Sequence, residues 1–397
     1  INYDFRETYM LSLIMRADGS SNFPQGNRWG YFPSVSAGWV ITNEAFAEGL
    51  KPAIDFFKIR GSWGQNGNGQ LGDGTTLVRA SPINVGAVQN WRAVGAGSEF
   101  TVACSSPLPS FLNLTVPVLP SGSGLWSWGG NTNGRLGDNT TVGRFSPSPS
   151  GSETDWSFLA VGSGHTVAIK QDGSLYAWGQ NTNGQLGDGT TIDRLSPVRI
   201  GTDSWISCAA GAAHTVAIKA DGGLWGWGLN SAHQVGDGTT VNRLAPVRIG
   251  GTSTNWVRIA AGGLHSLAIK STGQLLGWGS GANSRLGLPV ANAGIPTVIG
   301  GDYDWVSVAA GEAHSLAVKA NGQLFGCGYN YAGEVVVGTS SQVNLLTRLG
   351  TATDWTVCAA SPAGYISAAI NSKNELWMWG SNQYGAIGDG TLYGNRL

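Results

Sequence analysis

Alternating apolar and polar residues recur along most of this chain in units of about 50 residues. In the clearest unit, T-V-A-I-K at 166–170 and S-L-Y-A-W at 174–178 flank a polar step at 171–173 that contains Asp-Gly. Alternation with a period of two predicts β-strands, and Asp-Gly or Asn-Gly between two such runs predicts a hairpin with a type I′ turn. The step recurs at 221–222 and 321–322, so the pattern predicts a series of antiparallel hairpins.

Tryptophan residues mark both halves of each unit. A Trp-Gly pair closes the hairpin at Trp63, Trp128, Trp178, Trp227, Trp278 and Trp379, with Cys327-Gly328 in register. Another Trp opens the unit at Trp91, Trp156, Trp205, Trp256, Trp305 and Trp355. Several short strands in one unit cannot bury their own faces, whereas radially stacked units cover one another. The repeats therefore predict a β-propeller.

Several units carry a Pro in their later part, at Pro147 in S-P-S, at Pro197 in S-P-V and at Pro246 in A-P-V. Because Pro lacks an N–H group, we expect it at a strand start or on an outer edge. The last unit stops at Leu397, where its neighbours continue into S-P-V. We therefore expect a propeller of the seven-bladed type, with six full repeats and an incomplete seventh. Residues 104–122 are expected to form an inserted surface loop.

Composition agrees with an all-β fold. The chain has 62 Gly among 397 residues and only 12% charged residues, which is typical of a turn-rich β protein. A formal net charge of -1 gives no global attraction to nucleic acid. No apolar run reaches the length of a membrane-spanning helix.

Residues 1–62 lack the repeat, so we predict domains at 1–62 and 63–397. Apolar residues alternate from Tyr9 to Met15 and from Val35 to Ile41, which predicts a short, β-hairpin-rich segment. Long alternating strands with aromatic ends are typical of outer-membrane barrels. An open set of about three strands is nevertheless too small to span a bilayer.

Both parts resemble known families. The repeats at 63–397 resemble those of the regulator-of-chromosome-condensation family, which implies a seven-bladed propeller used for protein recognition. Its members include a nuclear exchange factor that acts on a small GTPase and binds chromatin, and a secreted bacterial inhibitor of β-lactamases. R-A-D-G-S-S-N-F at 16–23 and F-K-I-R-G-S-W-G at 57–64 resemble TonB-dependent outer-membrane transporters of the starch-utilisation type.

The two resemblances meet at Lys58–Trp63, where a barrel-like strand ends on the Trp-Gly-Gln-Asn string that also begins a propeller loop. One hypothesis is that this strand occupies the place of the missing inner strand of the seventh blade. The alternative, which we favour, is a chimera joined at this short shared string.

Several side-chain patterns could carry chemistry. His165, His214, His265 and His314 share one repeat position, but they come one per blade, so we favour histidines bonded by local backbone over a metal ring. An Arg follows a loop Asp by six residues at Asp73/Arg79, Asp138/Arg144, Asp188/Arg194 and Asp237/Arg243, and by seven at Asp389/Arg396. Because the fifth and sixth units lack both members, we predict ion pairs that hold these loops.

Other motifs predict structural roles. Gly67–Gly72 matches G-x-G-x-x-G, but Asp-Gly-Thr-Thr follows instead of a helix, which favours a chance match. Cys104, Cys208, Cys327 and Cys358 stand at apolar repeat positions and are expected to be core residues. We assign no catalytic, cofactor-binding or metal-binding residue.

Aromatic residues outside the repeat pattern, Tyr329 and Tyr331, are the candidate ligand-binding residues, because Tyr is favoured at interfaces. We expect a bacterial, non-enzymatic propeller that binds a protein, has no cofactor or nucleic-acid partner, and is a monomer at the cell surface, in the outer membrane or outside the cell. The alternatives are a piece of an outer-membrane TonB-dependent transport component, a nuclear-type exchange factor, and a chimeric or truncated product with no function as a whole.

Overall fold

A computed structural model describes residues 2–5, 9–19, 29–39, 69–83, 85, 91–105, 124–335, 341–391 and 395–396. The chain divides into two compact units, Ile1–Arg60 and Gly61–Leu397. Among the described residues the only helices are three short 3-10 turns, η4 (Thr132–Gly134), η5 (Ala282–Ser284) and η6 (Gln383–Gly385). None of them is long or apolar enough to cross a membrane. The all-β class is confirmed.

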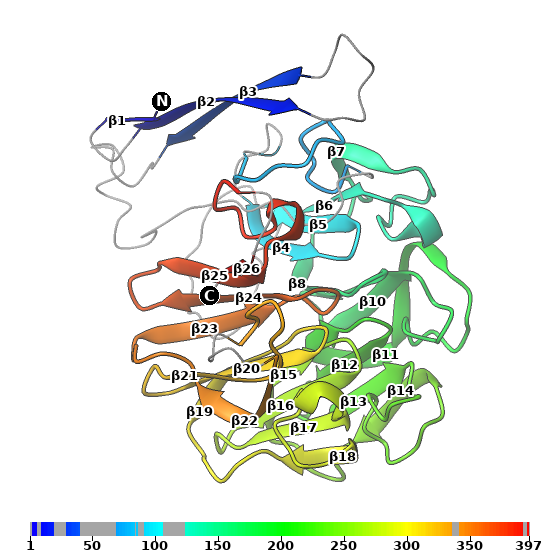
Figure 1. The fold of residues 1–397 in the computed structure, drawn as a ribbon. Helices are drawn as coiled ribbons and strands as arrows, with labels where there is room; N and C mark the ends of the chain where they lie inside the picture. The colour runs from blue at the N-terminus through cyan, green and yellow to red at the C-terminus, as the bar shows by residue number, and fades with distance from the viewer. Residues whose placement is uncertain are drawn as a thin grey trace, which may run out of the picture. The chain divides into compact units, whose positions relative to one another are not determined.

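The first unit contains an antiparallel meander of three strands (Figure 1). They are β1 (Asn2–Phe5), β2 (Tyr9–Gly19) and β3 (Trp29–Trp39). Leu11 lies opposite Ala37, and Leu13 opposite Val35, as the alternation of the sequence predicts. The likeness of this segment to a barrel stays a prediction, and the strand expected at 57–63 lies outside the described residues.

The described residues of the second unit form six antiparallel blades, four of them separate four-stranded sheets and two joined through β11 into one seven-stranded sheet. The first comprises β4 (Trp91–Ala96), β5 (Phe100–Ser105), β6 (Gly124–Gly129) and β7 (Arg144–Pro149). The second comprises β8 (Trp156–Val161), β9 (His165–Lys170), β10 (Ser174–Gly179) and the first part of β11 (Arg194–Ala210). The third comprises the rest of β11, β12 (His214–Lys219), β13 (Leu224–Gly228) and β14 (Arg243–Ile249).

Three further blades follow in sequence order. The fourth comprises β15 (Trp256–Ala261), β16 (His265–Lys270), β17 (Leu275–Ser280) and β18 (Asn292–Val298). The fifth comprises β19 (Trp305–Ala310), β20 (His314–Lys319), β21 (Leu324–Tyr329) and β22 (Gln342–Arg348). The sixth comprises β23 (Trp355–Ala360), β24 (Ile366–Asn371), β25 (Leu376–Ser381) and β26 (Asn395–Arg396).

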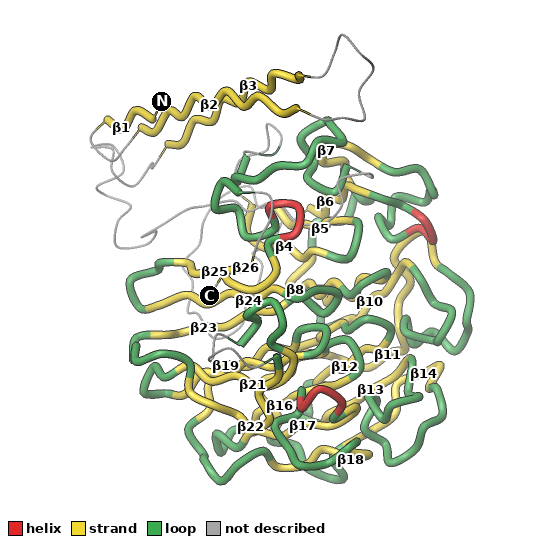
Figure 2. The backbone as a smooth tube through the Cα atoms, in the orientation of Figure 1, coloured by secondary structure: helices red, strands yellow, loops and turns green. Residues whose placement is uncertain are grey.

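Each blade has the same internal order, which follows from the repeat. The opening Trp begins the first strand, and the first strands of consecutive blades contact one another, which places them nearest the axis. The Trp-Gly pair ends the third strand, and loops separate the strands at both ends (Figure 2). Pro147 and Pro246 lie on the edge strands β7 and β14, as expected, whereas Pro197 lies in β11, an inner strand of the seven-stranded sheet.

The core lies between blades, as radial stacking requires. Val167, Ile169 and Leu175 of the second blade form one buried cluster with Trp205 and Trp227 of the third. Burying a large apolar side chain contributes about 1.5–3 kcal/mol, and the same arrangement recurs from blade to blade. Each blade is therefore stabilised chiefly by its neighbours.

The hairpin turns differ from the expected type I′ geometry. Gly173 has a φ of +83°, whereas Asp172 is not among the residues with positive φ. The Gly173 N–H bonds to the Lys170 carbonyl at 3.0 Å, and the Asp172 carboxylate accepts the Ser174 N–H at 2.8 Å. This is a type I turn followed by a left-handed Gly, which needs one positive φ instead of two. The prediction of a hairpin was right and that of its turn type was wrong.

A remnant of a seventh blade lies between the sixth and the first. The Gly390 N–H bonds to the Ala80 carbonyl at 2.8 Å, and the Gly74 N–H bonds to the Phe145 carbonyl at 2.8 Å. Complete neighbours make the same contact, as in the bond from Gly189 to Leu244 at 2.8 Å. Residues 69–83 and 85 therefore supply the loop and outer part of the seventh position, which confirms the incomplete seventh repeat.

Candidate protein-binding surface

Tyr329 and Tyr331, the two residues selected from the sequence, lie together after the third strand of the fifth blade. Tyr329 ends β21, and Tyr331 stands in the turn that follows. Their rings are stacked, with centroids 6.3 Å apart and planes inclined by 28°. Tyr331 is 73% exposed, whereas Tyr329 is half-buried.

The structure adds a third aromatic residue from the next blade. Tyr365, just before β24 of the sixth blade, is 42% exposed, and its ring centroid lies 5.3 Å from that of Tyr329. Sequence reasoning missed this residue, although it also lies outside the repeat pattern, directly before the Ile366 that replaces the repeat histidine. We call Tyr329, Tyr331 and Tyr365 the tyrosine patch.

Backbone and side-chain bonds hold the loops under the tyrosine patch. Arg285 Nη1 donates to the Glu312 carbonyl at 3.1 Å, and the Glu312 N–H donates to the Gly364 carbonyl at 3.3 Å. The Glu334 carboxylate accepts the Ala332 N–H at 2.9 Å. These bonds join the fourth, fifth and sixth blades, so the tyrosines stand on a fixed base.

Charged groups near the tyrosine patch have perturbed acidities. Burial raises the pKa of Glu334, whose Oε1 atom is buried without a hydrogen-bond partner. Burial also raises the pKa of Glu312, although Arg285 opposes that shift. The pKa of Tyr365 is raised by burial and then by the negative charge of Glu312. At neutral pH its hydroxyl therefore stays protonated and able to donate a hydrogen bond.

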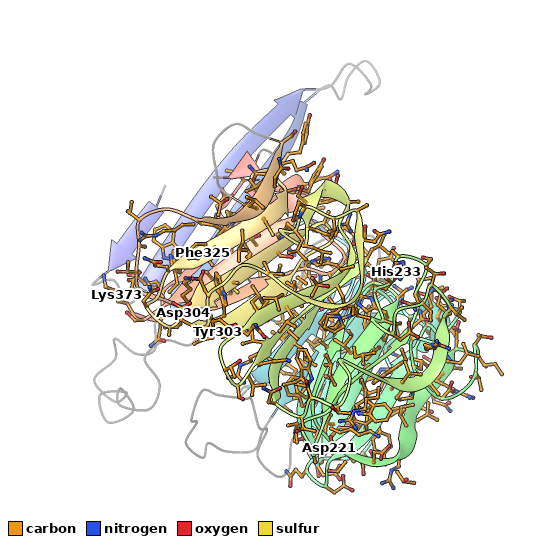
Figure 3. The ribbon with its side chains drawn as sticks, turned by 90° about the horizontal axis from the view of Figure 1, so that it is seen from below. Asp221, His233, Tyr303, Asp304, Phe325 and Lys373 are labelled. Carbon is orange, nitrogen blue, oxygen red and sulfur yellow. The ribbon has the colours of Figure 1, made fainter. Side chains whose placement is uncertain are left out.

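The two ends of the strands present different surfaces. Figure 3 shows Asp221 and His233 at opposite ends of the third blade, with the short hairpin turn at the Asp221 end and the long loop at the His233 end. Tyr331 follows the third strand of the fifth blade, and Tyr365 precedes the second strand of the sixth blade. Both residues therefore lie at the end of the strands that carries the long loops, where His233 lies in the third blade. Tyr303, labelled in Figure 3 beside Asp304, directly precedes β19 and lies at the opposite end of the strands, where the short hairpin turns lie.

The four repeat histidines are buried and bond to the next blade. His165 Nε2 lies 3.0 Å from Thr215 Oγ1, and that hydroxyl donates to the Gln185 carbonyl at 2.8 Å. The hydroxyl proton is used in the second bond, so Nε2 must supply the proton of the first. The equivalent pairs are His214–Ser266, His265–Ser315 and His314–Ser367. The expectation of a local backbone partner was therefore wrong, because the repeat pairs each imidazole with a neighbouring hydroxyl.

These imidazoles are held neutral by their surroundings. Burial lowers the pKa of His165 and of His314 to about 4, and that of His214 to about 3. Their Nδ1 atoms are buried without a hydrogen-bond partner. In the part of the chain that the structure describes, no group of three or more His, Cys, Asp or Glu side chains could hold a metal ion.

The predicted Asp–Arg pairs are confirmed at four loops. Asp73 and Arg79 approach to 2.7 Å, and Asp188 and Arg194 to 2.5 Å. The other two pairs are Asp138–Arg144 at 2.7 Å and Asp237–Arg243 at 2.5 Å. Burial alone would raise the pKa of the Asp188 carboxyl, but hydrogen bonds from Thr190 and Arg194 outweigh it and the pKa is lowered. The Arg396 side chain lies outside the description, so the pair Asp389/Arg396 stays a prediction.

The remaining motifs have the structural roles predicted for them. All four cysteines are buried and unbonded to one another, and burial raises the pKa of Cys104, Cys327 and Cys358 to about 12. Turns and bends follow the described part of the G-x-G-x-x-G match, with no helix at 73–83. Residues 106–123, most of the predicted insertion, lie outside the described residues.

Comparison with known families agrees with this architecture. The RCC1-like domain matches residues 113–364, and the regulator of chromosome condensation (RCC1) repeat matches residues 62–104. The first match covers well over half of the chain. The chain therefore belongs to the RCC1-like domain family, and the resemblance of its repeats is confirmed.

Solved structures share the fold at low sequence identity. Prp20p from Saccharomyces cerevisiae has a TM-score of 0.70 and 21% identity, over 88% of this chain and 87% of that chain. Human WBSCR16 has a TM-score of 0.67 and 19% identity, over 79% of this chain and 82% of that chain. The Prp20p structure was presented with its binding properties to Gsp1p and histones.

A short N-terminal segment matches a second group of proteins. The TonB-dependent receptor SusC of Bacteroides thetaiotaomicron is 41% identical over 84 residues, and the TonB-dependent receptor P39 of Formosa agariphila is 35% identical over 82. In both comparisons the match covers 21% of this chain and 8% of the receptor. The chain thus spans less than a tenth of these receptors.

Proposed function

We propose that this propeller is a non-catalytic protein-binding module whose contact surface is the tyrosine patch. The carrying observation is that Tyr331 and Tyr365, 73% and 42% exposed, come from adjacent blades and gather around Tyr329. Tyr is enriched at protein interfaces because it offers large apolar area and a hydroxyl at low entropic cost. Members of this fold family act mainly as binding or exchange-factor proteins.

The fixed base under the tyrosine patch supports this role. The bonds from Arg285 to Glu312 and from Glu312 to Gly364 join the loops that carry the tyrosines. Side chains already held in place lose less entropy on binding, so preorganisation favours affinity. The protonated Tyr365 hydroxyl adds a hydrogen-bond donor at the rim.

The test compares alanine variants in selection against a displayed library of random short peptides. Peptides enriched by the wild-type chain should lose binding to Tyr331→Ala and Tyr365→Ala. Tyr303→Ala is the matched control, since Tyr303 is 62% exposed and lies at the opposite end of the strands. If the enriched peptides bind Tyr331→Ala and Tyr365→Ala as well as the wild type, the tyrosine patch is not the binding surface.

The absence of an enzymatic role is part of the same proposal. A fluorescent GDP analogue loaded on a small GTPase supplies the direct test, because an exchange factor accelerates its release. We expect no acceleration beyond the spontaneous rate. Acceleration that depends on chain concentration would favour the exchange-factor alternative.

We further propose a bacterial origin and a place at the cell surface, in the outer membrane or outside the cell. The support is the 41% identity of a short segment with SusC. The same observation favours a second candidate, a component of a TonB-dependent transport system. Amplification of source DNA across the codons for residues 40–90 tests the join. A continuous product supports one gene, whereas two separately located halves would restrict the function to the propeller.

A further inference from the structure

Four blades hold the ammonium group of a lysine over the ring of their own opening Trp. In the third blade, Lys219 Nζ lies 5.1 Å from the ring centroid of Trp205 and 3.5 Å from that of Trp225. The Asp203 carboxylate contacts the same ammonium at 2.8 Å. Aromatic faces and a carboxylate both attract a positive charge, which accounts for this position. The equivalent lysines of the second, fourth and fifth blades are Lys170, Lys270 and Lys319.

Acidic residues just before the opening Trp complete this arrangement. Lys319 Nζ lies 3.2 Å from Asp304, the residue directly before Trp305, and 3.0 Å from Asp302. The second blade has the same arrangement, formed by Lys170, Glu153 and Asp155. An aromatic pair, an acid and a lysine therefore recur together at the hairpin-turn end of a blade.

The sixth blade keeps the aromatic pair and the acid but lacks the lysine. The rings of Trp355 and Trp377 are in T-shaped contact, with centroids 6.1 Å apart and planes inclined by 85°. Asp354 directly precedes Trp355, as an acid does in the second and fifth blades. The strand register places Asn371 opposite Trp355, at the position that the lysines occupy in their own blades.

The described part of the sixth blade supplies no other cation at this position. Asn371 Nδ2 donates to the Glu375 carboxylate at 2.7 Å, which brings a second acid to the same end of the blade. Lys373, labelled in Figure 3, stands in the hairpin turn and is exposed. Among the described residues, no cation lies over the ring of Trp355 or Trp377, and none pairs with the Asp354 carboxylate.

The aromatic pair of the sixth blade is accessible from solvent. Trp355 packs against the cluster that contains Leu316 and Val318 of the fifth blade, so this side of the sixth blade faces described residues. Trp355 is nevertheless partly exposed, whereas the opening Trp of each lysine-containing blade is at most 3% exposed. Trp377 is 56% exposed. A lysine stem covers apolar surface, and here that cover is missing.

The first blade provides a natural comparison, because it also lacks the lysine. Ser105 lies opposite its opening Trp91, and Trp126 Nε1 donates to Ser105 Oγ at 2.8 Å. Asn90 stands where the sixth blade has Asp354. The first blade has thus lost the cation and the acid together, whereas the sixth blade keeps an acid and an aromatic pair without their cation.

We propose that Trp355, Trp377 and Asp354 bind a lysine side chain of a partner polypeptide. The four lysine-containing blades show that an alkyl stem and a primary ammonium fit this position. A primary ammonium can donate to Asp354, and the Glu375 carboxylate adds negative charge beside it. These residues lie at the hairpin-turn end of β24, whereas Tyr365 precedes the other end, so the proposal does not depend on the tyrosine patch.

The test uses saturation-transfer NMR with the full chain and a blocked tripeptide that has a central lysine. Saturable binding is expected, and the same tripeptide with norleucine, an uncharged side chain of similar length, should not bind. Trp377→Ala should weaken binding at least tenfold. Asn371→Lys should do the same, because the internal ammonium would then occupy the position. Trp126→Ala, a matched change at the same strand position of the first blade, should leave binding unchanged.

A further variant keeps the test decisive if Asn371→Lys does not fold. Asp354→Asn preserves the size of the side chain and removes its charge, so it should also weaken binding. The proposal is overturned if no saturable binding occurs, if norleucine binds as well as lysine, or if binding survives both Trp377→Ala and Asp354→Asn. Tighter binding of an arginine tripeptide would overturn lysine as the occupant.

Discussion

Acidification from pH 7 to 5 should destabilise the propeller through its buried histidines. An unfolded histidine has a pKa of about 6.5, whereas burial lowers that of folded His165 to about 4. The unfolded chain therefore binds more protons between these values, so stability is complete above about pH 6.5 and is lost as pH falls toward 4. At pH 5 each such histidine costs about 2 kcal/mol. His165, His214 and His314 together would cost about 6 kcal/mol, within the usual 5–15 kcal/mol stability of a domain.

Urea unfolding followed by tryptophan fluorescence at pH 7, 6 and 5 measures this loss. The matched variant is His165→Phe, because the first blade already carries Phe100 at the same position. It loses the bond to Thr215, so it should be less stable at pH 7 but should lose about 2 kcal/mol less between pH 7 and 5. If that variant does not fold, His214→Asn replaces it. An unfolding free energy that stays constant from pH 7 to 5, or a variant with the wild-type slope, would refute the reasoning.

Three further outcomes follow from the loops and the core. Arg194→Met should cost no more than about 1 kcal/mol in urea unfolding, because the guanidinium is partly exposed. Asp188→Ala should cost about 1–3 kcal/mol, because three donors besides Arg194 lose their acceptor. Equal costs would contradict this order. Gly222→Ala should lower Tm more than Gly189→Ala. The two glycines have similar positive φ angles, +78° and +82°, but only at Gly222 would the added Cβ meet backbone atoms. The Cys208 thiol should react with a thiol reagent only after unfolding, because it is buried with a raised pKa; rapid labelling of the native chain would show that its blade opens.

The repeat allowed most of the propeller to be predicted, because its spacing fixes both strand order and neighbour. Trp178 and Trp227 stand one unit apart in sequence, and their blades pack together in space. The turn at Gly173 was harder, because Asp-Gly is compatible with two hairpin geometries and only the strand register selects between them. The partner of His165 was missed because it lies 50 residues away, in the next repeat unit.

The candidate site was predicted in part. Tyr329 and Tyr331 stood out because they break the pattern of their own unit. Tyr365 broke the pattern of the following unit, but its proximity to Tyr329 depends on how two blades pack, which no single unit encodes. The partner protein is not written in the repeat at all, since a fold used for many partners carries its specificity in loop side chains.

One continuous strand makes two of the blades unlike the others. β11 runs from Arg194 to Ala210 and joins the second and third blades into one seven-stranded sheet. Neighbouring repeats normally open and close as nearly separate units, so a shared strand couples two of them into one cooperative unit. Amide hydrogens of β9 and β12 should therefore exchange last in the chain. Those of β24, whose Ala368 and Ile370 side chains are partly exposed, should exchange early, so opening would begin at the sixth blade and reach this joined pair last.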